Sequence, residues 1–214
     1  MPRGILTRAT TPAHLLLLLG VLAVAAAGWV VHRRGASAAA SEEQAMVLCR
    51  LVLKAARARG PVDLGDARAA QALAATVSRR AAVELVPVPV PEPQRGRLLL
   101  LRTATHLFAL SRAPTDDRTA AAAARGSAWE VLAWPAAGAS PGHAAFYLAE
   151  DLPLAHSRNL HADYVGLEAG AIPEPGSGRP QDPERSGQDA AYRGRDHERW
   201  LPVQRRTRLI VGYD

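Results

Sequence analysis

The sequences RLLLLR, at Arg97 to Arg102, and HLFALS, at His106 to Ser111, decide the fold that we expect for this chain. Short apolar runs bounded by polar and turn-forming residues are typical of β-strands. The two runs are separated by Thr103 to Thr105, a connection that suits a hairpin and is too short for the crossover that parallel strands need. They therefore predict the first hairpin of an antiparallel sheet.

Further apolar runs extend this sheet. They are WEVLAW at Trp129 to Trp134, HAAFYLA at His143 to Ala149, and Leu152 to His156. Consecutive strands with short links pair with their neighbours most readily, so we expect an antiparallel meander of four or five strands. Apolar residues at Trp200 to Val203 and Arg208 to Val211 are enough for one last strand that returns to the sheet.

The residues before the sheet, 41 to 85, are predicted to be helical. Ser41 to Arg59 has a broad apolar face and begins with the capping-box pair Ser41 and Gln44. Gly60, followed by Pro, stops the helix after a basic last turn. We expect this helix to pack on one face of the sheet, because a one-sided apolar helix needs an apolar partner.

Three other segments complete the expected organisation. A second, Ala-rich helix is expected from Asp66 to Val83, on the surface of the domain. Pro alternates with apolar residues from Val86, so residues 86–96 are interpreted as an extended, Pro-rich linker to a sheet domain at residues 97–214. Within that domain Gly, Pro and charged residues dominate residues 159–196, a composition typical of a mobile loop.

Near the start of the chain, LLLLLGVLAVAAAGWVV, at Leu15 to Val31, has no ionisable side chain. As a helix it would be about 26 Å long, close to the ~30 Å hydrocarbon thickness of a bilayer. We expect a transmembrane anchor at residues 15–34 after a short basic segment at residues 1–14, with the lipid bilayer as partner and the C-terminal domain outside the cytoplasm. Two alternatives stay open: a signal sequence cleaved near Ala25 to Ala27, and a buried helix of a water-soluble domain.

Charge and cysteine content narrow the range of partners. The formal net charge is +6, and Lys54 is the single lysine. The Arg residues are interleaved with Asp and Glu rather than gathered in one stripe, so we expect no nucleic-acid partner. Cys49 is the single cysteine, which excludes an intrachain disulfide. Its place in an apolar helix face predicts a small buried hydrophobe rather than a reactive thiol.

The tightest group of candidate metal ligands is His156, His161 and Asp163, in HSRNLHAD. The spacing of the two histidines matches neither a His-Glu-x-x-His helix nor a common zinc motif. Ser157, beside His156, lacks the Gly-x-Ser-x-Gly context of a nucleophile elbow. The sequence therefore predicts no metal ligand and no catalytic residue here.

Other polar or aromatic groups are weaker candidates. The sequence from Gly176 to Gly178 lacks the length and the Lys of a phosphate loop. Glu150 and Asp151 are adjacent after a strand, which is typical of a solvated turn, and the nearby tryptophans of WEVLAW are expected in the core. We therefore expect no cofactor, no small-molecule substrate and no enzymatic activity.

A hydrophobic N-terminal helix that continues into an amphipathic one, followed by a small antiparallel meander, resembles the architecture of bacterial type IV pilins and type II secretion pseudopilins. Leu15 to Arg59 and Leu98 to Gly166 carry the resemblance, which includes the Ala-Phe-aromatic strand and acidic turn in GHAAFYLAED. The prepilin signature is absent, since Thr11 to His14 precedes the apolar run and the run holds no acid. The resemblance implies a membrane anchor and an exported domain.

These observations together predict an α+β protein with an N-terminal transmembrane helix and an amphipathic helix packed on a small antiparallel meander. We expect a single-pass, membrane-anchored envelope protein whose pilin-like domain acts through protein–protein contact in a secretion or surface system. One alternative is a membrane-attached hydrolase or metal-binding enzyme built on His156, His161 and Asp163. A second alternative is an exported module that binds small molecules or polymers.

Overall fold

The computed structural model describes residues 12–60, 62–92, 94–113, 128–138, 144–168, 170–182 and 190–203, with side chains from residue 36 onward. The chain divides into two compact units, Met1–Ser37 and Ala38–Asp214. The second unit holds the sheet, and the site described below lies within it.

Two helices precede the sheet, α1 at Pro12–Arg59 and α2 at Ala67–Ala81. The predicted start of a helix at Ser41 is wrong, because α1 is continuous through that residue and the Ser41 hydroxyl donates to the carbonyl of Ala38. The Ala-rich residues before Ser41 explain this, since Ala has the highest helix propensity. The predicted second helix is confirmed, with Asp66 as an N-cap that accepts from the amide of Arg68.

The predicted fold class, an α+β protein with an N-terminal transmembrane helix and a small meander, is wrong for the described structure, which is mostly an antiparallel sheet with two helices. The side chains of the predicted anchor at residues 15–34 lie outside the described part. Among the residues whose side chains are described, no helix is both long enough and apolar enough to cross a bilayer.

The sheet is larger than the predicted meander of four or five strands. Within the described residues it has eight antiparallel strands in the order β1-β2-β3-β4-β5-β6-β8-β7. Their bounds are β1 Val86–Val88, β2 Leu98–Arg102, β3 His106–Arg112, β4 Trp129–Pro135, β5 Ala145–Ala149, β6 Leu152–Ser157, β7 Tyr192–Arg193 and β8 Arg199–Pro202. The predicted return of the chain near residues 200–203 is confirmed as β8, whereas the predicted strand residues 208–211 lie outside the described part.

The additional strands come from segments whose composition disfavours a central strand. Val86–Val88 pairs with β2 and forms one edge of the sheet. Pro87 is compatible with this position because an edge strand needs ladder hydrogen bonds on one side alone. The Pro-rich stretch at residues 86–96 thus begins as a strand, and β7 forms the opposite edge of the sheet.

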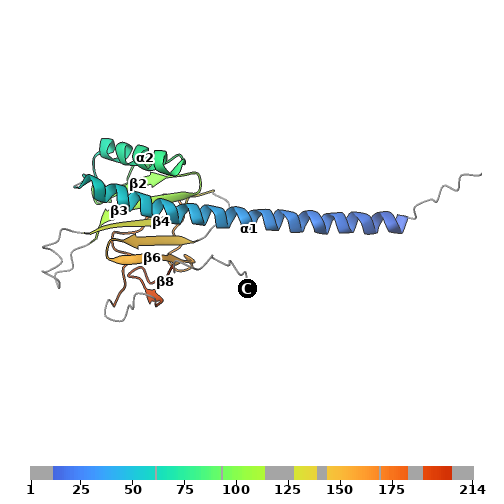
Figure 1. Ribbon diagram of the computed structural model, residues 1–214. Coiled ribbons are helices and arrows are strands. Elements are labelled where there is room, and N and C mark those ends of the chain that lie inside the picture. The colour runs from blue at the N-terminus through green and yellow to red at the C-terminus, as the bar shows by residue number, and fades with distance from the viewer. Residues whose placement is uncertain are drawn as a thin grey trace, which may run out of the picture. The chain divides into compact units, whose positions relative to one another are not determined.

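The two faces of the sheet are covered by different parts of the chain. On one face, α1 and α2 pack against the strands (Figure 1), with Leu48 and Val52 of α1 fully buried against Phe108 and Val131. This confirms the predicted packing of the amphipathic helix on the sheet. Cys49 is buried there too, as predicted, and burial raises the pKa of its thiol to about 12.

The other face is covered by the segment after β6, where the sequence predicts a mobile loop at residues 159–196. The described parts of this segment are instead packed: Tyr164 and Ile172 are buried in a second core with Trp134 and Trp200. Few apolar residues suffice to hold this segment in place, because the buried carboxylates of Glu130 and Glu198 accept hydrogen bonds from its backbone. The domain therefore has three layers: helices, sheet and an irregular covering segment (Figure 1).

Candidate functional site

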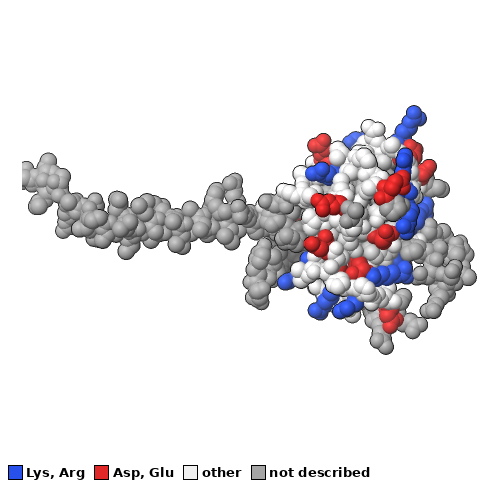
Figure 2. Space-filling view, turned by 180° about the vertical axis from the view of Figure 1, so that it is seen from behind, with Lys and Arg blue, Asp and Glu red and all other residues white. Residues whose placement is uncertain are grey.

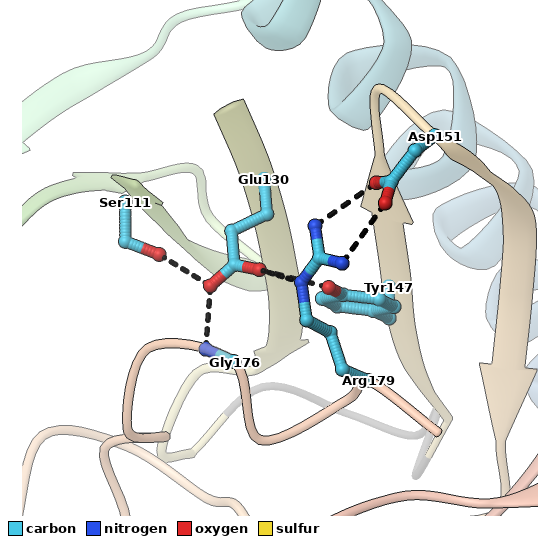
Figure 3. A network of polar contacts seen from close by, with 6 residues as sticks. All are labelled: Ser111, Glu130, Tyr147, Asp151, Gly176 and Arg179. Carbon is cyan, nitrogen blue, oxygen red and sulfur yellow. Dashed lines mark hydrogen bonds and ion pairs between the residues drawn. The ribbon is translucent and has the colours of Figure 1, made fainter. Parts of the chain in front are cut away.

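A buried carboxylate, Glu130, lies at the centre of a polar network between the sheet and the covering segment (Figure 3). Glu130 is on β4, and its side chain points to the face of the sheet opposite the helices. One of its oxygens accepts from the hydroxyl of Ser111 at 2.9 Å and from the amide of Gly176. The other accepts from the hydroxyl of Tyr147 at 2.8 Å and from Nε of Arg179 at 3.3 Å. A buried charge is costly unless it is paired in this way.

Arg179 connects this buried centre to the protein surface. Its two terminal nitrogens bind the two oxygens of Asp151 at 2.9 and 3.0 Å, a bidentate ion pair. Burial acts to raise the pKa of Asp151, but the hydrogen bonds and charge of Arg179 outweigh it and hold that pKa below its usual value. The pair anchors the covering segment to the turn between β5 and β6.

Close packing reinforces the network. A Cβ atom added to Gly178 would lie 2.5 Å from Cγ of Tyr147, so the backbone of the covering segment rests directly on the tyrosine ring. Burial, followed by the negative charge of Glu130, raises the pKa of Tyr147 well above its usual value. The tyrosine therefore stays protonated and serves as a hydrogen-bond donor.

A second carboxylate, Glu198, binds the loop at residues 159–166 in a similar way. One of its oxygens accepts from the hydroxyl of Ser157 at 2.6 Å, and the other accepts from the amides of His161 and Ala162. Burial acts to raise the pKa of Glu198, but these hydrogen bonds outweigh it and lower the pKa. The side chain is thus an ionised acceptor that fixes the loop backbone.

Asp196 and Asn159 complete this arrangement. Asp196 accepts from the hydroxyl of Tyr164 at 3.0 Å and from Nε1 of Trp200 at 3.2 Å, and burial raises its pKa. Asn159, in the left-handed backbone region at φ 54°, exchanges two 2.8 Å hydrogen bonds with the backbone of Tyr164. These contacts close the loop on itself and leave its tip in a defined conformation.

This loop exposes two apolar side chains. Leu160 is 81% exposed, and Val165 in the same loop is 37% exposed. A large apolar side chain held on a fixed backbone differs from one on a mobile terminus, because little conformational entropy remains to be lost when a partner covers it. The 159–166 loop is therefore the candidate functional site of the domain.

The structure separates the residues that the sequence suggested as metal ligands. His156 lies on β6, half-buried and in register with Phe146, which faces the helices. His161 and Asp163 are exposed on the loop that covers the opposite face. Nowhere in the described residues does a group of three His, Cys, Asp or Glu side chains have the geometry to hold a metal ion. His161 instead lies beside His197, with ring centroids 5.9 Å apart.

The other candidates have separate structural roles. Glu150 pairs with Arg57 of α1, whereas Asp151 pairs with Arg179, so the two acids do not act together. Trp129 and Trp134 are both buried, as predicted, on opposite faces of β4. The sequence at residues 176–178 binds Glu130 and Tyr147 through its backbone.

Sequence reasoning missed Glu130, Glu198 and Arg179. A signal was present for Glu130, because it is the one charged residue within the apolar run WEVLAW, where a buried strand must find it a partner. Arg179 had no comparable signal, since its partners are 49 and 28 positions away in the chain.

The surface charge is mixed. Figure 2 shows acidic and basic side chains interspersed over the visible face of the described domain rather than gathered by sign. Comparisons of the chain with protein-family models, curated proteins and solved structures give no significant match. The function of the domain is therefore inferred from the site itself.

Proposed function

We propose that this domain acts through protein–protein contact, as a pilin-like component of a secretion or surface system, and that the 159–166 loop is its contact surface. The observation that carries the proposal is Leu160, 81% exposed on a backbone that Glu198 and Asn159 hold in place. Covering a leucine side chain contributes about 1.5–3 kcal/mol, and a preorganised loop loses little of this to ordering.

The arrangement of the domain supports the pilin-like part of the proposal. The C-terminal part of α1 packs on one face of an antiparallel sheet, as the resemblance to pilins and pseudopilins implies. The opposite face is covered by an irregular segment that presents the loop. In this arrangement the C-terminal part of α1 is buried against the sheet, and the exposed loop is accessible to a partner.

Site-specific photo-crosslinking in cells tests the proposal. A photoreactive amino acid in place of Leu160 should give a discrete adduct with a protein partner, identified by mass spectrometry. The matched control places the same amino acid at Val86, which is 41% exposed on the edge strand β1. Identical adducts from both positions, or none from position 160, would contradict the proposal.

Introducing a charge at position 160 distinguishes an effect on partner binding from an effect on folding. Leu160→Asp should leave the free energy of unfolding within about 0.5 kcal/mol of wild type, because the side chain is exposed. It should also abolish co-purification of the partner identified by the adduct. Retained co-purification would show that the loop is not the contact surface.

The location of the domain outside the cytoplasm stays a prediction. A C-terminal fusion to alkaline phosphatase, an enzyme that is active only after export, should be active if the prediction is correct. An inactive phosphatase, together with an active cytoplasmic reporter at the same position, would contradict it.

A further inference from the structure

Two exposed histidines from distant parts of the chain meet beside the 159–166 loop. The ring centroids of His161 and His197 lie 5.9 Å apart with an interplanar angle of 84°. Both side chains are exposed, so neither ring is enclosed by the core. Two imidazoles that bind one metal ion through nitrogen at about 2.0–2.1 Å have centroids about 4.5–6.4 Å apart, depending on the angle at the metal. The observed separation falls in that range.

The backbone under both rings is fixed in advance. The amide of His161 donates to the carboxylate of Glu198, which also holds the amide of Ala162. His197 has a φ of 65°, a region that a non-glycine residue adopts at a cost. This conformation is held by the hydrogen bond from the His197 amide to the carbonyl of Gly194. Each ring is therefore carried on a backbone position that a hydrogen bond holds in place.

The surroundings of His197 resemble the outer shell of a metal ligand. Nδ1 of His197 lies 2.8 Å from Nε2 of the Gln181 side-chain amide. A half-turn of this amide puts its carbonyl oxygen in the same place; Nδ1 then becomes the donor and the lone pair of Nε2 of His197 is directed outward, which is the usual arrangement for a metal-binding histidine. The carboxylate of Glu198, which accepts from the amide of His161, adds an acidic group close to the two rings.

We propose that His161 and His197 form a surface site for a late first-row divalent metal ion, with water in the remaining coordination positions. Imidazole ligands favour Cu²⁺, Ni²⁺ and Zn²⁺ over Mg²⁺ or Ca²⁺, and Cu²⁺ binds most tightly in this series. Bound metal would join the 159–166 loop to the turn that precedes β8. The site shares the 159–166 loop with the proposed protein contact, but its test needs no partner, since the ion binds to the chain alone.

Titration of the full-length chain with Cu²⁺, followed by calorimetry, tests this inference. We expect one ion per chain at this site, with nitrogen couplings from two imidazoles in the electron paramagnetic resonance spectrum. His161→Asn and His197→Asn should each weaken binding at least tenfold, and Gln181→Leu should weaken it about tenfold by removing the outer-shell partner. Asn is chosen at position 197 because it tolerates a positive φ.

His156→Asn is the matched control. His156 lies on β6 in register with Phe146, which packs on the face of the sheet that the helices cover. It should leave Cu²⁺ affinity unchanged, and circular dichroism should show that all variants are folded. Binding that survives both substitutions, equal loss in the His156 variant, or a spectrum without two nitrogen ligands would overturn the proposal.

Discussion

The buried histidine His106 should make the stability of the domain depend on pH in a defined direction. His106 begins β3, is 2% exposed, and packs near the rings of Phe108 and Phe146 at centroid distances of 6.4 and 6.1 Å. Its Nδ1 lies 3.0 Å from the hydroxyl of Thr105, while Nε2 is buried without a hydrogen-bond partner. Burial lowers the pKa of this imidazole from 6.5 to about 4.

The direction of the effect follows from proton linkage. Since the folded-state pKa lies below that of the unfolded chain, the unfolded state binds more protons between pH 6.5 and about pH 4. The stabilisation is complete above about pH 6.5 and is lost as pH falls through that window. At about 1.36 kcal/mol for each tenfold change in proton affinity, the loss attributable to His106 is about 2 kcal/mol at pH 5 and about 3 kcal/mol at pH 4.

The substitution His106→Phe isolates this contribution, because Phe fills a similar volume among the same rings and does not titrate. Urea unfolding of the full chain at pH 7 and pH 5, followed by circular dichroism, should show that wild type loses about 2 kcal/mol more than the variant on acidification. Leu73→Ala serves as the control: it weakens the core at a buried residue of α2 and keeps His106 with its neighbours Thr105, Phe108 and Phe146, so its loss on acidification should match that of wild type. Parallel pH profiles for wild type and His106→Phe, within about 0.5 kcal/mol, would refute the reasoning.

Two further predictions concern packing. Gly178→Ala should lower the free energy of unfolding, measured by denaturant titration, by about 1–3 kcal/mol, because its Cβ would lie 2.5 Å from the ring of Tyr147. Gly65→Ala is the control, since its Cβ would meet Asp63 at an ordinary 3.4 Å. Equal effects of the two substitutions would argue against the close contact at Gly178. Cys49, whose pKa burial raises from 9.0 to about 12, should react with a disulfide reagent at pH 8 about a thousandfold more slowly in the folded chain than in denaturant. Rapid labelling of the native protein would show that the thiol is accessible.

Local patterns were reliable wherever neighbouring residues determine the structure. The hairpin of β2 and β3 follows from two apolar runs and a three-residue link, and α2 follows from its Asp66 cap and its repeat of small apolar residues. The burial of Cys49 followed from its position on the apolar face of a helix. In these cases the periodicity of the chain and its turn residues carry the information.

The start of α1, the number of strands and the covering segment required the tertiary structure. Ser41 carries the sequence signature of a helix cap, but a cap has no role where the Ala-rich chain before it is already helical. Composition alone predicted that residues 159–196 could not stay ordered, since they offer little apolar area. That expectation left out Glu130 on β4 and Glu198 just before β8, which replace apolar burial with hydrogen bonds to the backbone of the segment.

The sequence by itself determined the antiparallel β2–β3 hairpin, the helical segments and the apolar faces that join them, because these depend on residues close together along the chain. Only the tertiary structure decided which groups Glu130 and Glu198 hold and brought His161 beside His197. Those partners are separated by tens of residues along the chain, and no local sequence pattern indicates which of them will pair. Their pairing arises because each buried charge must find donors among the groups that the folded sheet places within reach.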